Sequence, residues 1–154
     1  MGSNKSFTAE TSERYSRALF EVAKDAGELE KIETDIKNFQ LILNSSLELQ
    51  NFTKNPTQNI VTQNSVVDLI SKKLNFSKNT NNFFSLLVKK RRIFFVKKIL
   101  ESFLRLCSKK RGEIKASLIS SKELSETELE NISKELSLSM GSKIKFDYKV
   151  NNDL

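Results

Sequence analysis

Residues 83–112 read FFSLLVKKRRIFFVKKILESFLRLCSKKRG and combine a helical pattern of apolar residues with a dense positive charge. The stretch carries ten Lys and Arg against one acid, a net charge of +9, whereas the whole 154-residue chain carries +7. Five of the eleven Phe also lie in it. Basic residues interleaved with aromatic ones fit three classes of structure: a nucleic-acid binder, a membrane-surface helix, or a helix that packs one face and exposes the other.

The distribution of these residues on a helix favours the third class. At 100° per residue, residues 93–110 form an amphipathic helix. Its apolar side holds Val96, Ile99, Leu100, Phe103, Leu106 and Cys107. Its other side holds Lys97, Lys98, Glu101, Arg105 and Lys109. Binding of single strands needs exposed aromatic rings beside the basic groove, whereas here the aromatic residues mostly occupy the opposite face, with Phe94 and Phe95 ambiguous. We therefore predict a solvated basic face, with a basic nucleic-acid-binding or membrane-surface helical module as the alternative.

The residues before this stretch are also helical in pattern, because their apolar residues recur three and four apart. Gly27 separates the first two helices, and Pro56 suits the first turn of a new one. A polar break at residues 75–80 and a turn at 91–92 divide the rest. The predicted helices span residues 11–26, 28–44, 47–52, about 57–74, 81–90 and 93–110. We expect five or six helices and no strand before Gly112.

The period changes after Gly112. Residues 113–121 and 143–150 alternate apolar and polar side chains, as strands do. Between them Ser125 and Glu128 form a capping box that opens a helix, which ends at Gly141. The apolar face of that helix is predicted to hold Leu129, Ile132, Leu136 and Met140. The fold class is therefore mainly α: a helical domain, residues 1–110, followed by a small β-α-β domain, residues 111–154. The last strand lacks a cover on one side, so we expect the chain to be truncated after Leu154.

The chain lacks the residues that most catalytic sites use. The chain has no His, which removes the commonest general base and most transition-metal sites. Its four Gly are too far apart for a phosphate-binding loop. The single Cys, Cys107, lies on an apolar helix side and is predicted to be a buried thiol. We therefore predict no enzymatic activity, no cofactor and no metal. The sequence has no run of eighteen apolar residues, so it predicts no membrane-spanning helix.

Several motifs resemble the delta subunit of the F-type ATP synthase, the family of the mitochondrial oligomycin-sensitivity-conferring protein. Residues 14–23, RYSRALFEVA, resemble its RYARALFE(V/L)A, and residues 83–92, FFSLLVKKRR, resemble its FLxLLVxNxR. Asn55-Pro56 is similar to its NP loop. Further matches to its G...A...SA..LS pattern are Gly112, Ala116, Ser120, Leu124 and Ser125. Ser16 and Ser121 depart from the pattern, since the family has Ala at both positions, and its closing strand falls beyond Leu154.

The resemblance covers nearly the whole chain and implies a fold and a role. It implies an N-terminal six-helix bundle with a small α/β C-terminal domain. It implies a non-catalytic peripheral-stalk subunit, a stator, of a proton-translocating ATP synthase. Its partners would be the alpha subunits of the catalytic head, with beta as a further contact, and the b subunits of the stalk. The resemblance implies no nucleic-acid partner and no direct membrane insertion. The resemblance implies that the protein lies at the cytoplasmic face of the bacterial inner membrane, held there through its complex, or alternatively at the matrix side in mitochondria.

The resemblance also implies a partner-binding site. In the family the first and fifth helices form an apolar groove for a helix of an alpha subunit. Carried over position by position, the groove residues are Tyr15, Ala18, Leu19, Val22, Phe84, Leu87 and Val88. A small residue such as Ala18 would let a partner helix approach closely. The alternative, that these residues pack only on one another in the core, stays open at this point.

Overall fold

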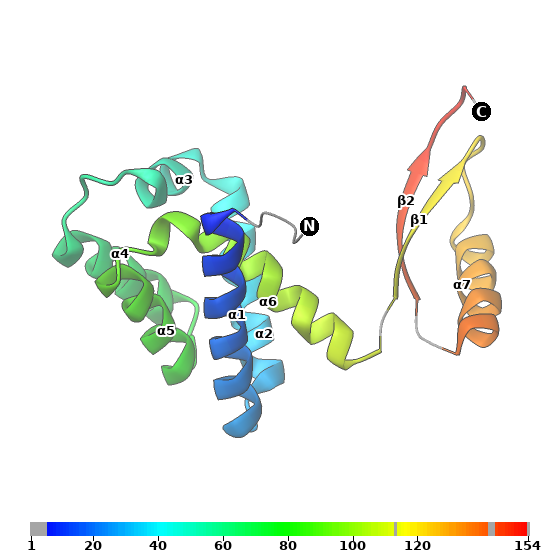
Figure 1. Ribbon diagram of the computed structural model, residues 1–154. Helices are drawn as coiled ribbons and strands as arrows, with labels where there is room; N and C mark the ends of the chain where they lie inside the picture. The colour runs from blue at the N-terminus through cyan, green and yellow to red at the C-terminus, as the bar shows by residue number, and fades with distance from the viewer. Residues whose placement is uncertain (1–5, 113, 142–143, 154) are drawn as a thin grey trace. The chain divides into compact units, whose positions relative to one another are not determined.

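The structure, a computed structural model, describes residues 6–112, 114–141 and 144–153 (Figure 1). Within these ranges it has seven α-helices, one short 3-10 helix and two strands. The mainly helical class with a small β-α-β part is therefore as predicted. The chain divides into two compact units, the first ending at Cys107 and the second beginning at Ser108. The boundary predicted from the sequence, between residues 110 and 111, lies slightly further along the chain.

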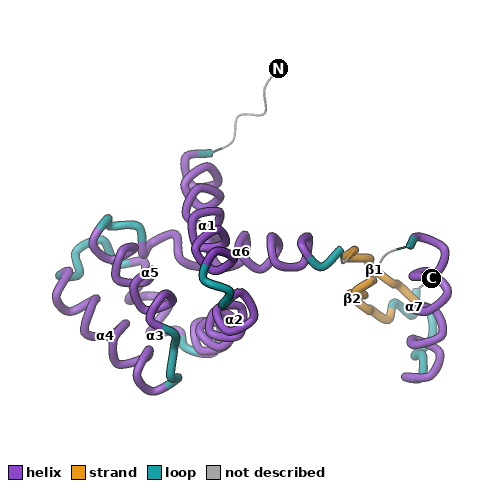
Figure 2. Tube along the Cα trace, turned by 90° about the horizontal axis from the view of Figure 1, so that it is seen from below, coloured by secondary structure: helices purple, strands orange, loops and turns teal. Residues whose placement is uncertain are grey.

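The first unit consists of helices. They are α1 (Phe7–Asp25), α2 (Leu29–Ser45), α3 (Leu47–Lys54), α4 (Ile60–Lys73), α5 (Lys78–Lys89), the 3-10 helix η1 (Ile93–Phe95) and α6 (Val96–Lys110), whose last residues belong to the second unit. Figure 2 shows α4 beside α5, and these two helices contact each other along their lengths. Helix α1 packs against α2, α5 and η1.

Side-chain caps decide where three of the helices begin, and they correct the predicted starts. Ser6 accepts a hydrogen bond from the Ala9 N–H (3.2 Å), so α1 begins before residue 11. Asn59 accepts from the Val61 N–H (2.7 Å), so α4 begins at Ile60 rather than near Thr57. Ser77 accepts from the Thr80 N–H (3.1 Å), so α5 begins inside the predicted polar break. Periodicity located these helices, but the caps fix their first turns.

The predicted turn at residues 91–92 is confirmed and has a left-handed residue in it. Arg91 has φ 57°, which lets the chain reverse after α5. The Arg92 N–H then donates to the Leu87 carbonyl (2.7 Å), which closes the end of the helix. After this turn the chain passes through η1 before the α-helical hydrogen bonding of α6 starts at Val96.

Aromatic rings lie in the core of the first unit. The Phe39 and Phe84 ring centroids lie 4.4 Å apart, which joins α2 to α5. The predicted faces of α6 are confirmed: its lysines and Arg105 are exposed, and only Leu106 of its apolar side is half-buried. The residues of α6 in the core are Val96, Ile99, Leu100, Phe103 and Cys107. The thiol of Cys107 is therefore buried, as predicted.

Two buried polar contacts join helices that are distant in sequence. The Asp35 carboxylate on α2 is fully buried and accepts hydrogen bonds from the Ser77 N–H and the Thr80 hydroxyl, each at 2.8 Å. The Lys31 ammonium lies 2.6 Å from the same carboxylate. On another side of the core, the Ser16 and Ser102 hydroxyls lie 2.8 Å apart and connect α1 to α6. These contacts fix which helices lie next to each other.

The second unit has the predicted β-α-β order: β1 (Ile114–Ser120), α7 (Glu126–Met140) and β2 (Ile144–Val150). The strands are parallel, and the register runs from Ile114 opposite Ile144 to Ser120 opposite Val150. Helix α7 packs against β2, and Figure 1 shows it along one face of the sheet. Glu113 and Lys143, the predicted first residues of the strands, lie outside the described ranges, as does Leu154.

The apolar face predicted for α7 is only partly covered. Leu129 and Ile132 are half-buried, whereas Leu136 and Met140 are exposed. The physical reason is that two strands offer too little surface to cover a helix of this length. Gly141 ends the helix with φ 67°, a left-handed conformation that glycine adopts without strain.

Helix α7 begins with a complete capping box. The Ser125 hydroxyl accepts from the Glu128 N–H (3.2 Å), and the Glu128 carboxylate accepts from the Ser125 N–H (2.9 Å). We expect Ser125→Ala to destabilise the second unit by about 1 kcal/mol, because the Glu128 N–H in the first turn loses its hydrogen-bond acceptor. Amide hydrogen exchange of α7 measures this. Ser139→Ala, an exposed change in the same helix, should leave exchange nearly unchanged; equal exchange in both variants would contradict the role of the cap.

Candidate partner-binding surface

Helix α1 carries a row of apolar side chains outside the core. Tyr15, Ala18 and Val22 are spaced three and four apart, so they share one side of the helix. Ala18 is exposed, Val22 is 47% exposed and Tyr15 is half-buried. The Arg14 guanidinium lies 5.7 Å from the centre of the Tyr15 ring, which it can hold in place by a cation–π contact. We call Tyr15, Ala18 and Val22 the α1 stripe.

The structure places the other four predicted groove residues in the core. Leu19 of α1 is almost completely buried, and Phe84, Leu87 and Val88 of α5 have no exposed surface. On α5 these residues form the side that packs against α2 and the remaining core, with Phe84 against Phe39. They have no surface to offer a partner helix in this structure. Of the seven residues carried over from the resemblance, the accessible ones are therefore those of the α1 stripe.

Leu86 is an accessible apolar residue of α5 that the sequence reasoning missed. It is 39% exposed, and its helix packs against α1. The signal was present in residues 83–88, FFSLLV. Two pairs of apolar residues four apart define the buried side, and Leu86 falls outside it at 100° per residue. An apolar residue outside the buried stripe of an amphipathic helix is the better candidate for a partner contact.

The described residues lack the pattern of a metal-ligand cluster and that of a membrane-spanning helix. In the ranges that the structure describes, no three His, Cys, Asp or Glu side chains lie together as metal ligands would. The same ranges hold no helix of the length and apolarity that a bilayer crossing needs. The α1 stripe has a small residue at its middle and two larger apolar ones beside it. A helix with an apolar face could lie along it.

Comparison with known proteins decides the family. The sequence model described as ATP synthase delta (OSCP) subunit matches residues 11–154. The chain belongs to the ATP synthase delta (OSCP) subunit family. This confirms the resemblance drawn from the motifs at residues 14–23, 55–56 and 83–92.

Individual relatives agree with this delta-family membership. An ATP synthase subunit delta of Pelagibacter ubique (strain HTCC1062) is 41% identical over 149 residues, which cover 97% of this chain and 80% of the relative. That of Paramagnetospirillum magneticum (strain ATCC 700264 / AMB-1) is 29% identical over 92% of this chain and 77% of its own length. A chain in the cryo-EM structure of the Toxoplasma gondii mitochondrial ATP synthase hexamer has the same fold. Its TM-score is 0.73 at 20% identity, over 90% of this chain and 76% of that one.

Proposed function

We propose that this delta-family chain is a non-catalytic peripheral-stalk subunit of a proton-translocating F-type ATP synthase, linking the alpha subunits of the head to the b subunits of the stalk. The observation that carries the proposal is the family match over residues 11–154. The identity of 41% to a named ATP synthase subunit delta supports it. We further propose that the helices of the first unit act as a six-helix bundle, and that the chain lies at the cytoplasmic face of a bacterial inner membrane through its complex.

A stator has to bind without yielding to the torque of the rotor. The α1 stripe and Leu86 supply an apolar surface on helices that are already held by a packed core, so little conformational entropy is lost on binding. The N-terminal helix of an alpha subunit is the proposed occupant, by the helix-in-groove mode. Attachment of the second unit to a b subunit would add avidity, because two linked contacts dissociate much more slowly than either one.

Ala18→Trp tests the α1 stripe. The indole would occupy the space that a partner helix needs, so we expect the affinity for a synthetic peptide of the alpha-subunit N-terminus to fall at least tenfold, about 1.4 kcal/mol. Calorimetry measures the affinity, and circular dichroism checks the fold, which should persist because Ala18 is exposed. Arg17→Trp, at an exposed position outside the stripe, is the control. An unchanged affinity in Ala18→Trp would remove the stripe from the proposal.

The assembled state provides a test of the class of function. Affinity purification of the tagged chain from native membranes should recover alpha and b subunits. Recovery of nucleic acid, or salt-sensitive binding to anionic vesicles in place of subunits, would instead support the alternative of a basic nucleic-acid-binding or membrane-surface module.

A further inference from the structure

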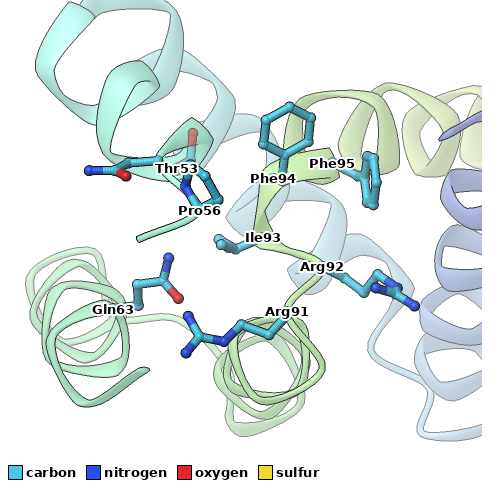
Figure 3. Close-up of a pocket in the computed structure, with 9 residues that line it drawn as sticks. Thr53, Pro56, Gln63, Arg91, Arg92, Ile93, Phe94 and Phe95 are labelled. Atoms are coloured by element: carbon cyan, nitrogen blue, oxygen red, sulfur yellow. The ribbon is translucent and has the colours of Figure 1, made fainter. Parts of the chain in front are cut away.

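Two recesses in the first unit share an exposed aromatic residue in their walls. The larger recess has a volume of about 240 Å³. Three parts of the chain form it: the loop that follows α3, helix α4, and the turn that follows α5. Its walls include Pro56, Gln63 and Ile93. The smaller, of about 30 Å³, is lined by Leu43 of α2 and by residues of α3 and α6. Both recesses are bordered by Phe94, which is 52% exposed. We call the two recesses with Phe94 the Phe94 site (Figure 3 shows the larger).

The Phe94 site is positively charged. Arg91 and Arg92 line the larger recess, and Lys54 and Lys97 line the smaller one, whereas no Asp or Glu lines either. None of these four cations forms an ion pair with an acid in the described ranges of the chain. The Arg91 guanidinium is held over the recess by its hydrogen bond to the Gln58 carbonyl (2.7 Å). The Arg92 guanidinium lies 5.7 Å from the centre of the Phe7 ring, and Figure 3 shows it pointing away from Gln63 and Pro56. The charges available to an acidic partner are therefore those of Arg91, Lys54 and Lys97.

A buried amide oxygen in the wall of the larger recess lacks a hydrogen-bond partner. Gln63 is 3% exposed, and its Oε1 has no hydrogen bond to any described residue. Figure 3 shows its side chain pointing from α4 toward Pro56 and Ile93, with the Arg91 guanidinium next to it. Buried polar atoms are nearly always hydrogen-bonded, so an unpaired one in a recess indicates a group that the chain itself does not supply. An amide can both donate and accept, as a polar peptide side chain requires.

The aromatic rings of the site favour a peptide over a nucleic acid. Phe94 and Phe95 pack edge to face, with centroids 5.4 Å apart, and Phe95 packs in the same way on Phe7 at 6.0 Å. Stacking of bases along a strand needs open ring faces beside the cations. The larger recess is also below the usual volume of small-molecule sites, about 300–1,000 Å³, and suits one large side chain.

We propose that the Phe94 site binds an acidic amphipathic helix of a partner protein, with a side chain that hydrogen-bonds Gln63 in the larger recess, apolar side chains against Phe94, and carboxylates beside Arg91 and Lys97. Residues three or four apart on a helix lie on one side, so they can straddle the Phe94 ring. None of the residues of the α1 stripe lines either recess, so this is a second binding surface and does not rest on the first. Its recognition depends on charge, whereas the α1 stripe is apolar.

Site-specific crosslinking identifies the occupant. A photoreactive phenylalanine analogue replaces Phe94, the tagged chain is assembled in native membranes, and the crosslinked species are mapped by mass spectrometry. We expect a protein segment with an excess of Asp and Glu and with apolar residues three or four apart. Crosslinks to lipid or nucleic acid, crosslinks only to segments without excess acid, or no crosslink at all would each overturn the proposal.

Charge reversal then tests the recognition. A synthetic peptide of the crosslinked segment is titrated into the purified chain, and Arg91→Glu/Lys97→Glu should lower its affinity at least tenfold. Lys72→Glu/Lys73→Glu makes the same change at the exposed end of α4, away from both recesses, and should alter the affinity less than twofold. Equal losses in both double variants would overturn the proposal, because they would show only the effect of net charge. Ala18→Trp should leave this affinity unchanged, which separates failure here from failure of the α1 stripe.

Discussion

Phe84→Ala is expected to destabilise the first unit by about 3–5 kcal/mol, a large part of the stability of a domain of this size. Phe84 is completely buried, and its ring contacts the rings of Phe39 (4.4 Å), Phe76 (6.1 Å) and Phe83 (6.1 Å) between centroids. Removing it leaves a cavity between α2 and α5 that the rigid neighbours cannot fill. Urea denaturation followed by far-ultraviolet circular dichroism measures the loss.

Leu86→Ala on the same helix is the matched control. Leu86 is 39% exposed, so its truncation should cost less than about 1 kcal/mol. It should instead weaken binding of the alpha-subunit peptide, because Leu86 belongs to the accessible side of α5. A result in which Phe84→Ala costs no more than Leu86→Ala would contradict the assignment of Phe84 to the core.

Asp35→Ala is expected to cost about 3–5 kcal/mol, because it leaves several groups without their shared partner. The Asp35 carboxylate is fully buried and accepts from Lys31, from the Ser77 N–H and from the Thr80 hydroxyl. Loss of the carboxylate uncouples α2 from the first turn of α5. Asp35→Asn, which keeps one oxygen as an acceptor, should cost less.

The same denaturation experiment measures both Asp35 variants. Asp25→Ala, an exposed acid at the end of α1, is the control and should change the free energy of unfolding by less than about 0.5 kcal/mol. In a double-mutant cycle, Asp35→Ala and Thr80→Val should be strongly non-additive, because their side chains share a hydrogen bond. Additive effects would mean that the contact contributes little.

The sequence predicted the order of the elements well because most of them follow one period. The faces of α6 and the change from helix to strand after Gly112 could be found from the spacing of apolar residues alone. The first turns of α4 and α5 could not, because Asn59 and Ser77 act as caps only when their own backbone is extended. Asp35 also gave no signal, because an acid within a helical pattern usually faces water and its partners here lie on another helix.

The binding surface was harder to predict than the fold. Periodicity shows which residues share a side of a helix but not whether another helix covers that side. Leu87 and Val88 were carried over from the family together with Ala18 and Val22, yet Leu87 and Val88 lie on the buried side of α5, whereas Ala18 and Val22 lie on the exposed side of α1. The Phe94 site escaped prediction for a related reason: its walls come from four separate segments, and the recesses exist only after these have packed together.

The contact between Ser16 and Ser102 has a consequence for the order in which the chain can fold during synthesis. The two residues are 86 positions apart, and the core side of α1, with Leu19 and Ala23, shares its cluster with Phe103 and Cys107 of α6. On the ribosome, α4 and α5 can pair soon after they emerge, because their contacts are local. Helix α1 is made first and can pair with α2 and then α5, but the part of its buried side that contacts α6 stays uncovered until α6 has been made. That part of α1 is therefore accessible to a chaperone until α6 has been made.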